Sequence, residues 1–295
     1  MKRYLIYITT LLLAVGCAQP KPQAEGEQIY VSIAPLRALV EGIVEQDFPI
    51  EVLVPAGASP ESFELSPKQL IALNGAQWLF ATGLIEFETT LLARLEGQTP
   101  IVALDRGIEP IAGSCSHAHH AGHHHTHGVD PHIWTSPRAL KQMSQTIYDA
   151  IHERYPESVR YTQNFNRLQD RLDSLDKTIT ARIEASDVES FIIYHPALTY
   201  YARDYGLRQI AIEQEGKEPS AKRLAELIRV AHAEGIRQVL VQRQFPTSSV
   251  EAVAEDMEAE VVVFDPLAEN VIENIGHITD LNLCKHLFAD INKTI

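Results

Sequence analysis

The residues of this chain that are best able to do chemistry are histidines, and most of them lie in one short run. The run is internal and is interrupted by Ala118, Ala121, Gly122 and Thr126, whereas a purification tag is usually terminal and continuous. Near pH 7 a neutral imidazole offers a nitrogen lone pair to borderline-soft metal ions. So dense a run cannot form a packed core, which predicts an exposed accessory metal-binding loop at residues 116–127. Its histidines are His117, His119, His120, His123, His124, His125 and His127.

Four further candidate ligands stand beside prolines, at or near the ends of predicted strands. They are Glu61, His132, His195 and Asp265. Proline fixes its own backbone and biases the preceding residue towards extended geometry, so side chains at such corners have little freedom. Each residue alone fits an ordinary turn. Taken as a set, with two from each half of the chain, they predict a preformed metal site where the halves meet.

The donor types of this set leave the identity of the metal open. Two imidazoles and two carboxylates suit tetrahedral zinc. The same donors are hard enough to suit manganese or ferrous iron. Glu64 and His277 are substitute ligands in this scheme, although each also fits a surface or packing role.

Short β-branched runs alternate with amphipathic segments such as 66–74 and 220–234, and these are expected to position the ligands. This alternation predicts an α/β fold with two similar lobes, each built on a parallel sheet covered on both faces. Because the carboxyl ends of such strands face the ligand crevice, His195 and Asp265 should point into it. The expected strands are 29–33, 50–54, 77–81, 101–104, 191–194, 209–212, 239–242 and 261–264.

The longest periodic segment lies between the two halves. Apolar residues recur every three or four positions from Tyr161 to Ile183, which predicts one long linking helix at 156–185, beginning at Pro156. A coiled-coil dimer seam is the alternative, but roughly four heptads are short for one. We expect a monomer with a strut along an N-terminal lobe (29–155) and a C-terminal lobe (186–295).

The N-terminus has the pattern of an export signal. Lys2 and Arg3 precede an apolar run too short to span a bilayer, and small residues lead to Cys17. That pattern resembles the signal peptide of bacterial lipoproteins (1–17), in which the cysteine is lipidated, and a polar tether follows at 18–28. Removing Lys2 and Arg3 leaves 23 basic residues against 39 acidic ones, a charge of about −16, which argues against nucleic-acid binding. Whether Cys115 and Cys284 pair is left open.

Several motifs together resemble a known family. Val54-Pro55-Ala56-Gly57-Ala58-Ser59-Pro60, Asp130-Pro131-His132-Ile133-Trp134, Tyr194-His195-Pro196-Ala197, Arg203-Asp204-Tyr205-Gly206 and Glu215–Ser220 resemble the zinc-type (ZnuA-like) cluster A-I metal-binding subunits of bacterial ABC importers.

The resemblance implies two α/β lobes joined by a long helix, one Zn²⁺ in the cleft between them, and delivery to an ABC-type membrane permease from the cell envelope. His132, His195 and Asp265 match family ligands, whereas Glu61 stands where a histidine is usual, which keeps Mn²⁺ possible. Ser220 is expected to cap a helix, and Trp134 to form a wall of the site.

Two rival functions belong to other classes. An exported metalloenzyme requires an open metal position and a general acid or base. The chain has neither a His-Glu-x-x-His motif nor a Gly-x-Ser-x-Gly motif. A metal-storage or adhesin lipoprotein is the other rival, and many equivalent metal sites would distinguish storage from transport.

Overall fold

The computed structural model describes residues 28–95, 99–113, 128–213 and 219–283. The predicted signal peptide, Cys17, most of the tether, the histidine-rich run, Cys115 and Cys284 lie outside the described residues.

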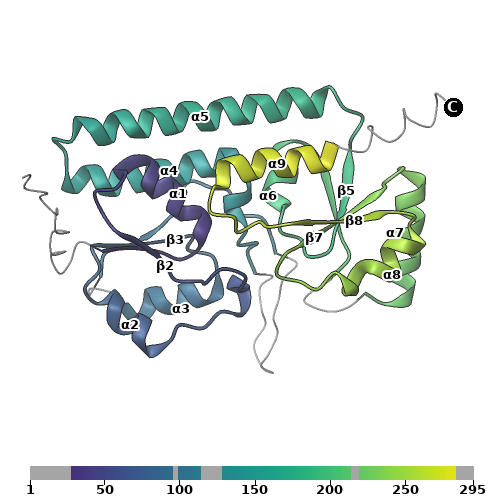
Figure 1. Ribbon diagram of the computed structural model, residues 1–295, viewed down its shortest axis with the longest axis horizontal. Coiled ribbons are helices and arrows are strands. Elements are labelled where there is room, and N and C mark those ends of the chain that lie inside the picture. The colour runs from purple at the N-terminus through teal and green to yellow at the C-terminus, as the bar shows by residue number, and fades with distance from the viewer. Residues whose placement is uncertain (1–27, 96–98, 114–127, 214–218, 284–295) are drawn as a thin grey trace, which may run out of the picture.

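Two four-stranded parallel sheets form the centres of two lobes, as the alternating pattern predicted (Figure 1). Both sheets have the same arrangement, in which the first strand pairs with the second on one side and the third on the other. The N-terminal sheet, of order β2-β1-β3-β4, contains β1 (Ile29–Val31), β2 (Ile50–Val52), β3 (Trp78–Ala81) and β4 (Ile101–Ala103). The C-terminal sheet, of order β6-β5-β7-β8, contains β5 (Ser190–Ile193), β6 (Arg208–Ala211), β7 (Gln238–Gln242) and β8 (Glu260–Phe264).

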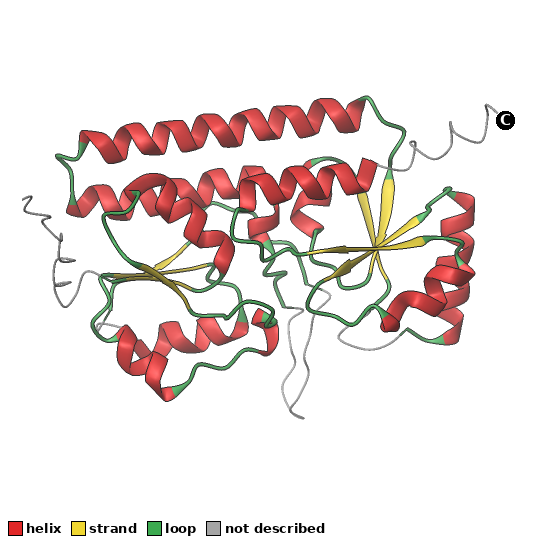
Figure 2. Ribbon diagram, viewed as in Figure 1, coloured by secondary structure: helices red, strands yellow, loops and turns green. Residues whose placement is uncertain are grey.

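Helices lie on both sides of each sheet (Figure 2). This cover explains why the central strands β3 and β5 are buried along their whole length and are nearly continuous in apolar residues. The N-terminal lobe carries α1 (Ala34–Val44), α2 (Pro67–Leu73), α3 (Glu86–Leu95) and α4 (Pro137–Arg154), with short 3₁₀ turns η1 (Pro60–Ser62) and η2 (Ile133–Thr135). The C-terminal lobe carries α6 (Thr199–Asp204), α7 (Ala221–Ala233), α8 (Ser248–Asp256) and α9 (Val271–Leu283).

The long linking helix α5 (Val159–Glu184) runs along one edge of both lobes (Figure 1). Its apolar stripe, including Phe165, Leu168 and Leu172, is buried against α1, α4 and α9 within the same chain. The stripe is therefore used inside the molecule, as a strut requires. At about 1.5 Å per residue the helix is about 39 Å long.

The predicted start of this helix at Pro156 was wrong by three residues. Ser158 is the residue that caps α5, because its hydroxyl accepts a hydrogen bond from the backbone N–H of Tyr161. Pro156 lies in the turn after α4, where it disfavours helical geometry at the preceding Tyr155. Ser220 does cap α7, as predicted, by accepting from the N–H of Arg223.

The two lobes are joined by more than the strut. One apolar core extends from β1 of the first lobe to α9 of the second. The indole N–H of Trp134 in the N-terminal lobe donates to the carbonyl of Pro266 after β8, at 3.0 Å. Arg37 of α1 also forms a 2.8 Å ion pair with Glu269. These contacts tie the two lobes to each other.

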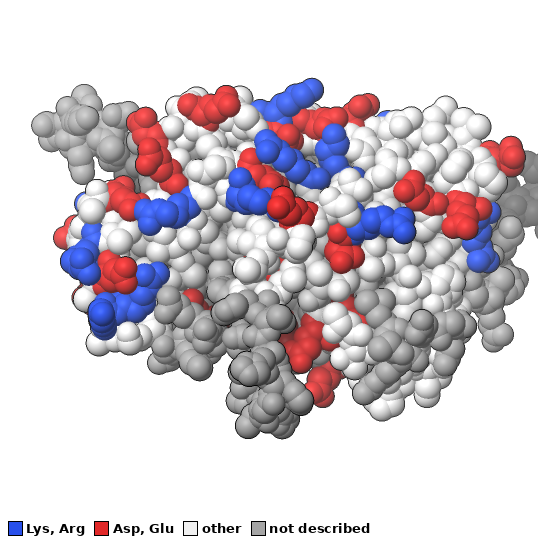
Figure 3. Space-filling model, turned by 180° about the vertical axis from the view of Figure 1, so that it is seen from behind, with Lys and Arg blue, Asp and Glu red and all other residues white. Residues whose placement is uncertain are grey.

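Basic and acidic side chains are interspersed over the upper part of the face seen in Figure 3. Ion pairs between helices include those of Arg138 of α4 with Asp176 of α5, at 2.9 Å, and of Lys141 with Asp173. Exposed pairs of this kind add little stability individually. Within the part of the chain that is described, no helix has the length and apolar character needed to cross a membrane.

Candidate metal centre

Three of the four predicted ligands converge between the lobes. One donor atom each from Glu61, His132 and His195 lies within 4.8 Å of the other two, and this is the only such group of His, Cys, Asp and Glu in the described residues. Glu61 belongs to η1 after β2, and His132 directly precedes η2. His195 follows β5 by two residues, at the carboxyl edge of the second sheet.

The Glu61 carboxylate is the point at which both imidazoles meet. Its Oε1 lies 2.9 Å from Nε2 of His195 and 3.4 Å from Nε2 of His132. Both histidine side chains are about 4–5% exposed and that of Glu61 is 14% exposed. The two imidazole nitrogens that would bind a metal therefore face one carboxylate oxygen in a nearly closed site.

A second carboxylate stands behind each imidazole. Asp130 Oδ1 lies 2.9 Å from Nδ1 of His132 and accepts a second hydrogen bond, also of 2.9 Å, from the His132 backbone N–H. Glu213 Oε2 lies 3.4 Å from Nδ1 of His195. Carboxylates in this position fix the tautomer and orientation of metal-binding histidines.

Sequence reasoning did not assign these two orienting roles. Asp130 is part of the Asp-Pro-His motif, so its position next to His132 was a usable signal. Glu213 directly follows the predicted strand 209–212, in the same way that His195 follows 191–194. The strand-end rule that selected His195 would have selected Glu213 as well.

Packing from three sides holds the histidines in place. The buried side-chain amide of Gln242, at the end of β7, makes two hydrogen bonds with the His195 backbone. Its oxygen accepts from the His195 N–H at 3.3 Å, and its nitrogen donates to the His195 carbonyl. The Phe245 ring stacks on His195, with centroids 5.3 Å apart. Trp134 packs against His132 at 5.1 Å, which confirms its predicted role as a wall.

The surrounding acids favour positive charge at the site. Burial lowers the pKa of His195, but the interactions of its ring with the carboxylates of Glu213 and Glu61 outweigh burial and raise that pKa to about 9. Burial also raises the pKa of Asp130, but the charge of His132 and its hydrogen bonds outweigh this and leave the pKa of Asp130 below its usual value. A divalent cation would satisfy the same carboxylates.

The space at the centre of this group is small. The cavity bordered by Glu61, His132, His195 and Trp134 measures about 20 Å³. A single water-sized sphere needs roughly 10–15 Å³ of such volume. The space between these side chains is therefore about that of one small ion or one water molecule.

Asp265 does not join the group in this structure. Its Oδ1 accepts hydrogen bonds from the Gln244 side-chain amide at 2.9 Å and from the Leu267 backbone N–H at 3.0 Å. Its neighbours Pro266 and Leu267 do line the 20 Å³ cavity. Asp265 as a fourth ligand stays a prediction.

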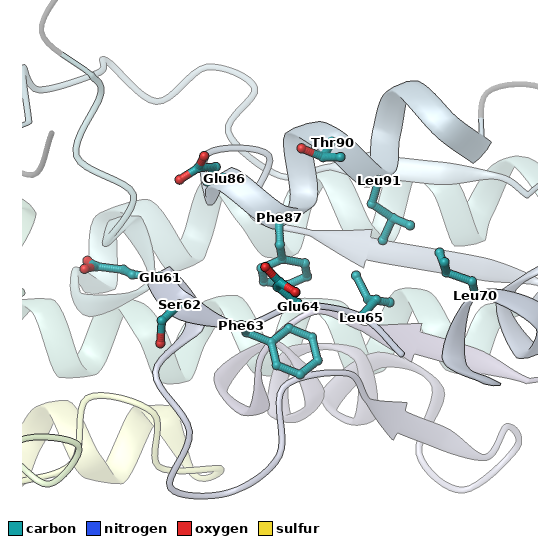
Figure 4. Close-up of a pocket in the computed structure, with 10 residues that line it drawn as sticks. All are labelled: Glu61, Ser62, Phe63, Glu64, Leu65, Leu70, Glu86, Phe87, Thr90 and Leu91. Atoms are coloured by element: carbon teal, nitrogen blue, oxygen red, sulfur yellow. The ribbon is translucent and has the colours of Figure 1, made fainter. Parts of the chain in front are cut away.

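The two substitute ligands lie elsewhere. Glu64 is exposed and borders a separate cavity of about 430 Å³ beside Glu61, in which the two carboxylates are set apart (Figure 4). Phe63, Phe87 and Leu91 supply apolar walls to that cavity. His277 is exposed on α9.

Comparisons with known proteins identify the family of this chain. A family model described as "ZnuA: Zinc-uptake complex component A periplasmic" matches residues 29–281. The zinc-binding lipoprotein AdcA of Streptococcus pneumoniae strain R6 is 28% identical over 283 residues, which is 90% of this chain and 56% of the relative. The chain thus spans about half the length of that relative.

Two solved structures of ZnuA are similar over nearly their full length. One has a TM-score of 0.79 and 32% identity, covering 88% of this chain and 99% of that chain. The other, a deletion mutant plus zinc bound, has a TM-score of 0.77 and 32% identity, covering 87% and 97%. The family model matches residues 29–281 and the solved ZnuA fold matches 88% of the chain, so this chain belongs to the ZnuA family of periplasmic zinc-uptake components.

Proposed function

We propose that this protein is an extracytoplasmic carrier that captures Zn²⁺ between its two lobes and delivers it to an ABC-type permease. The observation that carries the proposal is the meeting of two imidazole Nε2 atoms and one carboxylate oxygen around a cavity of about 20 Å³. Zinc is the cargo that the related AdcA and ZnuA proteins are named or described with.

The spacing of the donor atoms is close to what zinc requires. With zinc–ligand bonds of about 2.0–2.1 Å, ligand atoms at tetrahedral angles lie about 3.3 Å apart. The 3.4 Å from His132 Nε2 to Glu61 Oε1 already fits this spacing. The 2.9 Å from His195 Nε2 to the same oxygen is a hydrogen-bond distance, and it has to open by about 0.4 Å for the ion to enter.

A manganese or iron carrier of the same fold is the second candidate, and Glu61 is the residue that favours it. A carboxylate in place of a third imidazole makes the set of ligands harder, and harder ligands suit manganese and ferrous iron. The two buried imidazoles favour zinc, because nitrogen donors suit zinc better than manganese. Asp265 is the proposed fourth ligand in either case, once its Oδ1 leaves Gln244.

Carriage fits the site better than catalysis. A metalloenzyme has to admit its substrate to an open metal position, and the cavity beside Glu61, His132 and His195 holds about one water-sized sphere. Within the described residues, one closed site between the lobes is likewise not what storage of many ions requires. The proposal therefore sets both the enzyme and the storage function aside.

The proposal includes the chain's place in the cell envelope. We expect residues 1–17 to be a lipoprotein signal, Cys17 to be lipidated, and the lobes at 29–155 and 186–295 to act as a monomer at the membrane surface. The related AdcA carries the name lipoprotein. Metabolic labelling with a tritiated fatty acid, compared between the native chain and Cys17→Ala, tests this part.

Zinc stoichiometry tests the carrier function. A chain starting at residue 18 is expected to bind one zinc tightly and further zinc weakly, measured by calorimetry and by competition with a chromogenic chelator. Deleting residues 116–127 should leave the tight site, and His132→Ala should remove it. His277→Ala, an exposed histidine on α9, is the matched control and should have no effect. Loss of the tight site on deleting 116–127 would contradict the assignment to the interlobe site.

A further inference from the structure

We propose that Glu213 is a positioning residue that holds the His195 imidazole in place when zinc enters. This inference rests on the proposed function, because it concerns how the same site accepts its ion. Glu213 itself lies outside the group of donor atoms within 4.8 Å of one another, so its action is through His195 rather than on the metal.

The two histidines are held in opposite ways in the structure. The shorter contact of His132 is at Nδ1, which lies 2.9 Å from Asp130, whereas its Nε2 lies 3.4 Å from Glu61. The shorter contact of His195 is at Nε2, which lies 2.9 Å from Glu61, whereas its Nδ1 lies 3.4 Å from Glu213. The buried Nδ1 of His195 makes no well-formed hydrogen bond, so its contact with Glu213 is a loose one.

Entry of zinc reverses this arrangement at His195. The ion requires about 3.3 Å between Nε2 and Glu61 Oε1, so the ring has to withdraw by about 0.4 Å. Because Gln242 holds the His195 backbone by two hydrogen bonds, the movement away from Glu61 has to be made by the imidazole side chain. Glu213 lies on the Nδ1 side of the ring, away from Glu61, and the 3.4 Å contact there has room to shorten.

The chemistry of a metal-bound imidazole makes Glu213 the natural acceptor. When Nε2 binds a metal ion, Nδ1 carries the proton and donates a hydrogen bond. Glu213 is buried, and its backbone N–H donates to the carbonyl of Tyr194 at 3.0 Å, next to His195 in the chain. The extended pairing of β5 and β6 therefore holds the acceptor at a fixed distance from the ligand.

Loss of Glu213 should weaken zinc more than manganese. Removing an orienting partner behind a metal-binding histidine typically reduces affinity 10–100-fold. Manganese favours oxygen ligands and depends less on an accurately aimed imidazole. Glu213→Ala is therefore expected to lower zinc affinity about 10–100-fold and to narrow the preference for zinc over manganese. Asp130→Ala removes the partner of His132, whose Nδ1 already contacts Asp130 at 2.9 Å, and should lower the affinity for both metals.

The experiment compares Glu213→Ala, Glu213→Gln and a control, Glu226→Gln, an exposed α7 carboxylate that pairs with Arg223. Zinc and manganese affinities are measured by chelator competition, and Co²⁺ absorption spectra report the geometry of the site. Glu213→Gln should recover most of the zinc affinity, because its amide oxygen still accepts from Nδ1–H. The alanine variant should change the cobalt spectrum, and Glu226→Gln should match the native protein.

Two failures are distinguishable. If the native protein binds no zinc tightly, the proposed function fails, and this inference fails with it. If the native protein binds zinc tightly while folded Glu213→Ala has the same zinc affinity and the same cobalt spectrum, only the role of Glu213 is refuted. Unfolding curves of the metal-free variants show whether each is folded. If Glu213→Ala is unfolded, the Gln variant decides, since a loss of zinc affinity as large as that from removing His195 would also overturn the positioning role.

Discussion

Deprotonation of His195 is expected to destabilise the metal-free protein between about pH 6.5 and pH 9. The interactions of its ring with the carboxylates of Glu213 and Glu61 overcome the effect of burial and raise the pKa of His195 from 6.5 to about 9. An imidazolium between the carboxylates of buried Glu213 and half-buried Glu61 is thus more stable in the folded chain than in the unfolded one.

The direction of the effect follows from proton binding. Below pH 6.5 His195 is protonated in both states, and the stabilisation is fully present. As the pH rises, the unfolded chain releases this proton first, and the advantage of the folded state shrinks until it is lost as the pH passes about 9. At about 1.4 kcal/mol per pH unit, the loss is roughly 3 kcal/mol.

Urea unfolding of chelator-treated protein at about pH 6 and about pH 9.5 measures this loss. Other groups titrate in the same range, so the informative quantity is the difference between the native chain and His195→Gln. We expect the native chain to lose about 3 kcal/mol more than the variant on going to high pH. Equal losses in the two proteins would falsify the description of His195 as an imidazolium held by Glu61 and Glu213.

The remaining predictions concern single side chains near the site. Glu61→His should preserve or tighten zinc binding in chelator competition, because it restores a nitrogen donor; a tenfold or greater loss would mean that Glu61 has another task. Asp265→Asn should weaken zinc about tenfold or more in the same assay if Asp265 leaves Gln244 to become the fourth ligand, and unchanged affinity would remove it from the ligand set. Trp134→Phe should lower the free energy of unfolding by about 1–3 kcal/mol, because the buried carbonyl of Pro266 loses its donor; a change below about 0.5 kcal/mol in urea unfolding would contradict this.

Much of the fold was predictable because the strands are short, β-branched and bounded by turns. All eight expected strands overlap the observed ones to within two residues at either end, for example 101–104 against Ile101–Ala103. The long helix was predictable from its apolar period. Its first residue was not, because both Pro156 and Ser158 suit a helix start, and the choice depended on the turn that follows α4.

Ligands of the candidate site can be predicted only in part from the residues that follow strands. His195 and Asp265 both follow strands of the second sheet, and the same rule placed both in the crevice. Only His195 meets Glu61, because the Asp265 carboxylate is bound by Gln244 and by the N–H of Leu267. A side-chain rotamer of this kind depends on competing hydrogen bonds from residues that are distant in sequence or unremarkable in pattern, so the strand-end rule does not determine it.

The central claim is a single zinc site between the lobes, and a competition titration tests it most directly. The chain without residues 1–17 and 116–127 is incubated with equimolar zinc and manganese, separated from free metal and measured by elemental analysis. We predict one zinc per chain and almost no manganese, with neither metal retained by His132→Ala. Retention of manganese in place of zinc, or of zinc by His132→Ala, would contradict the account.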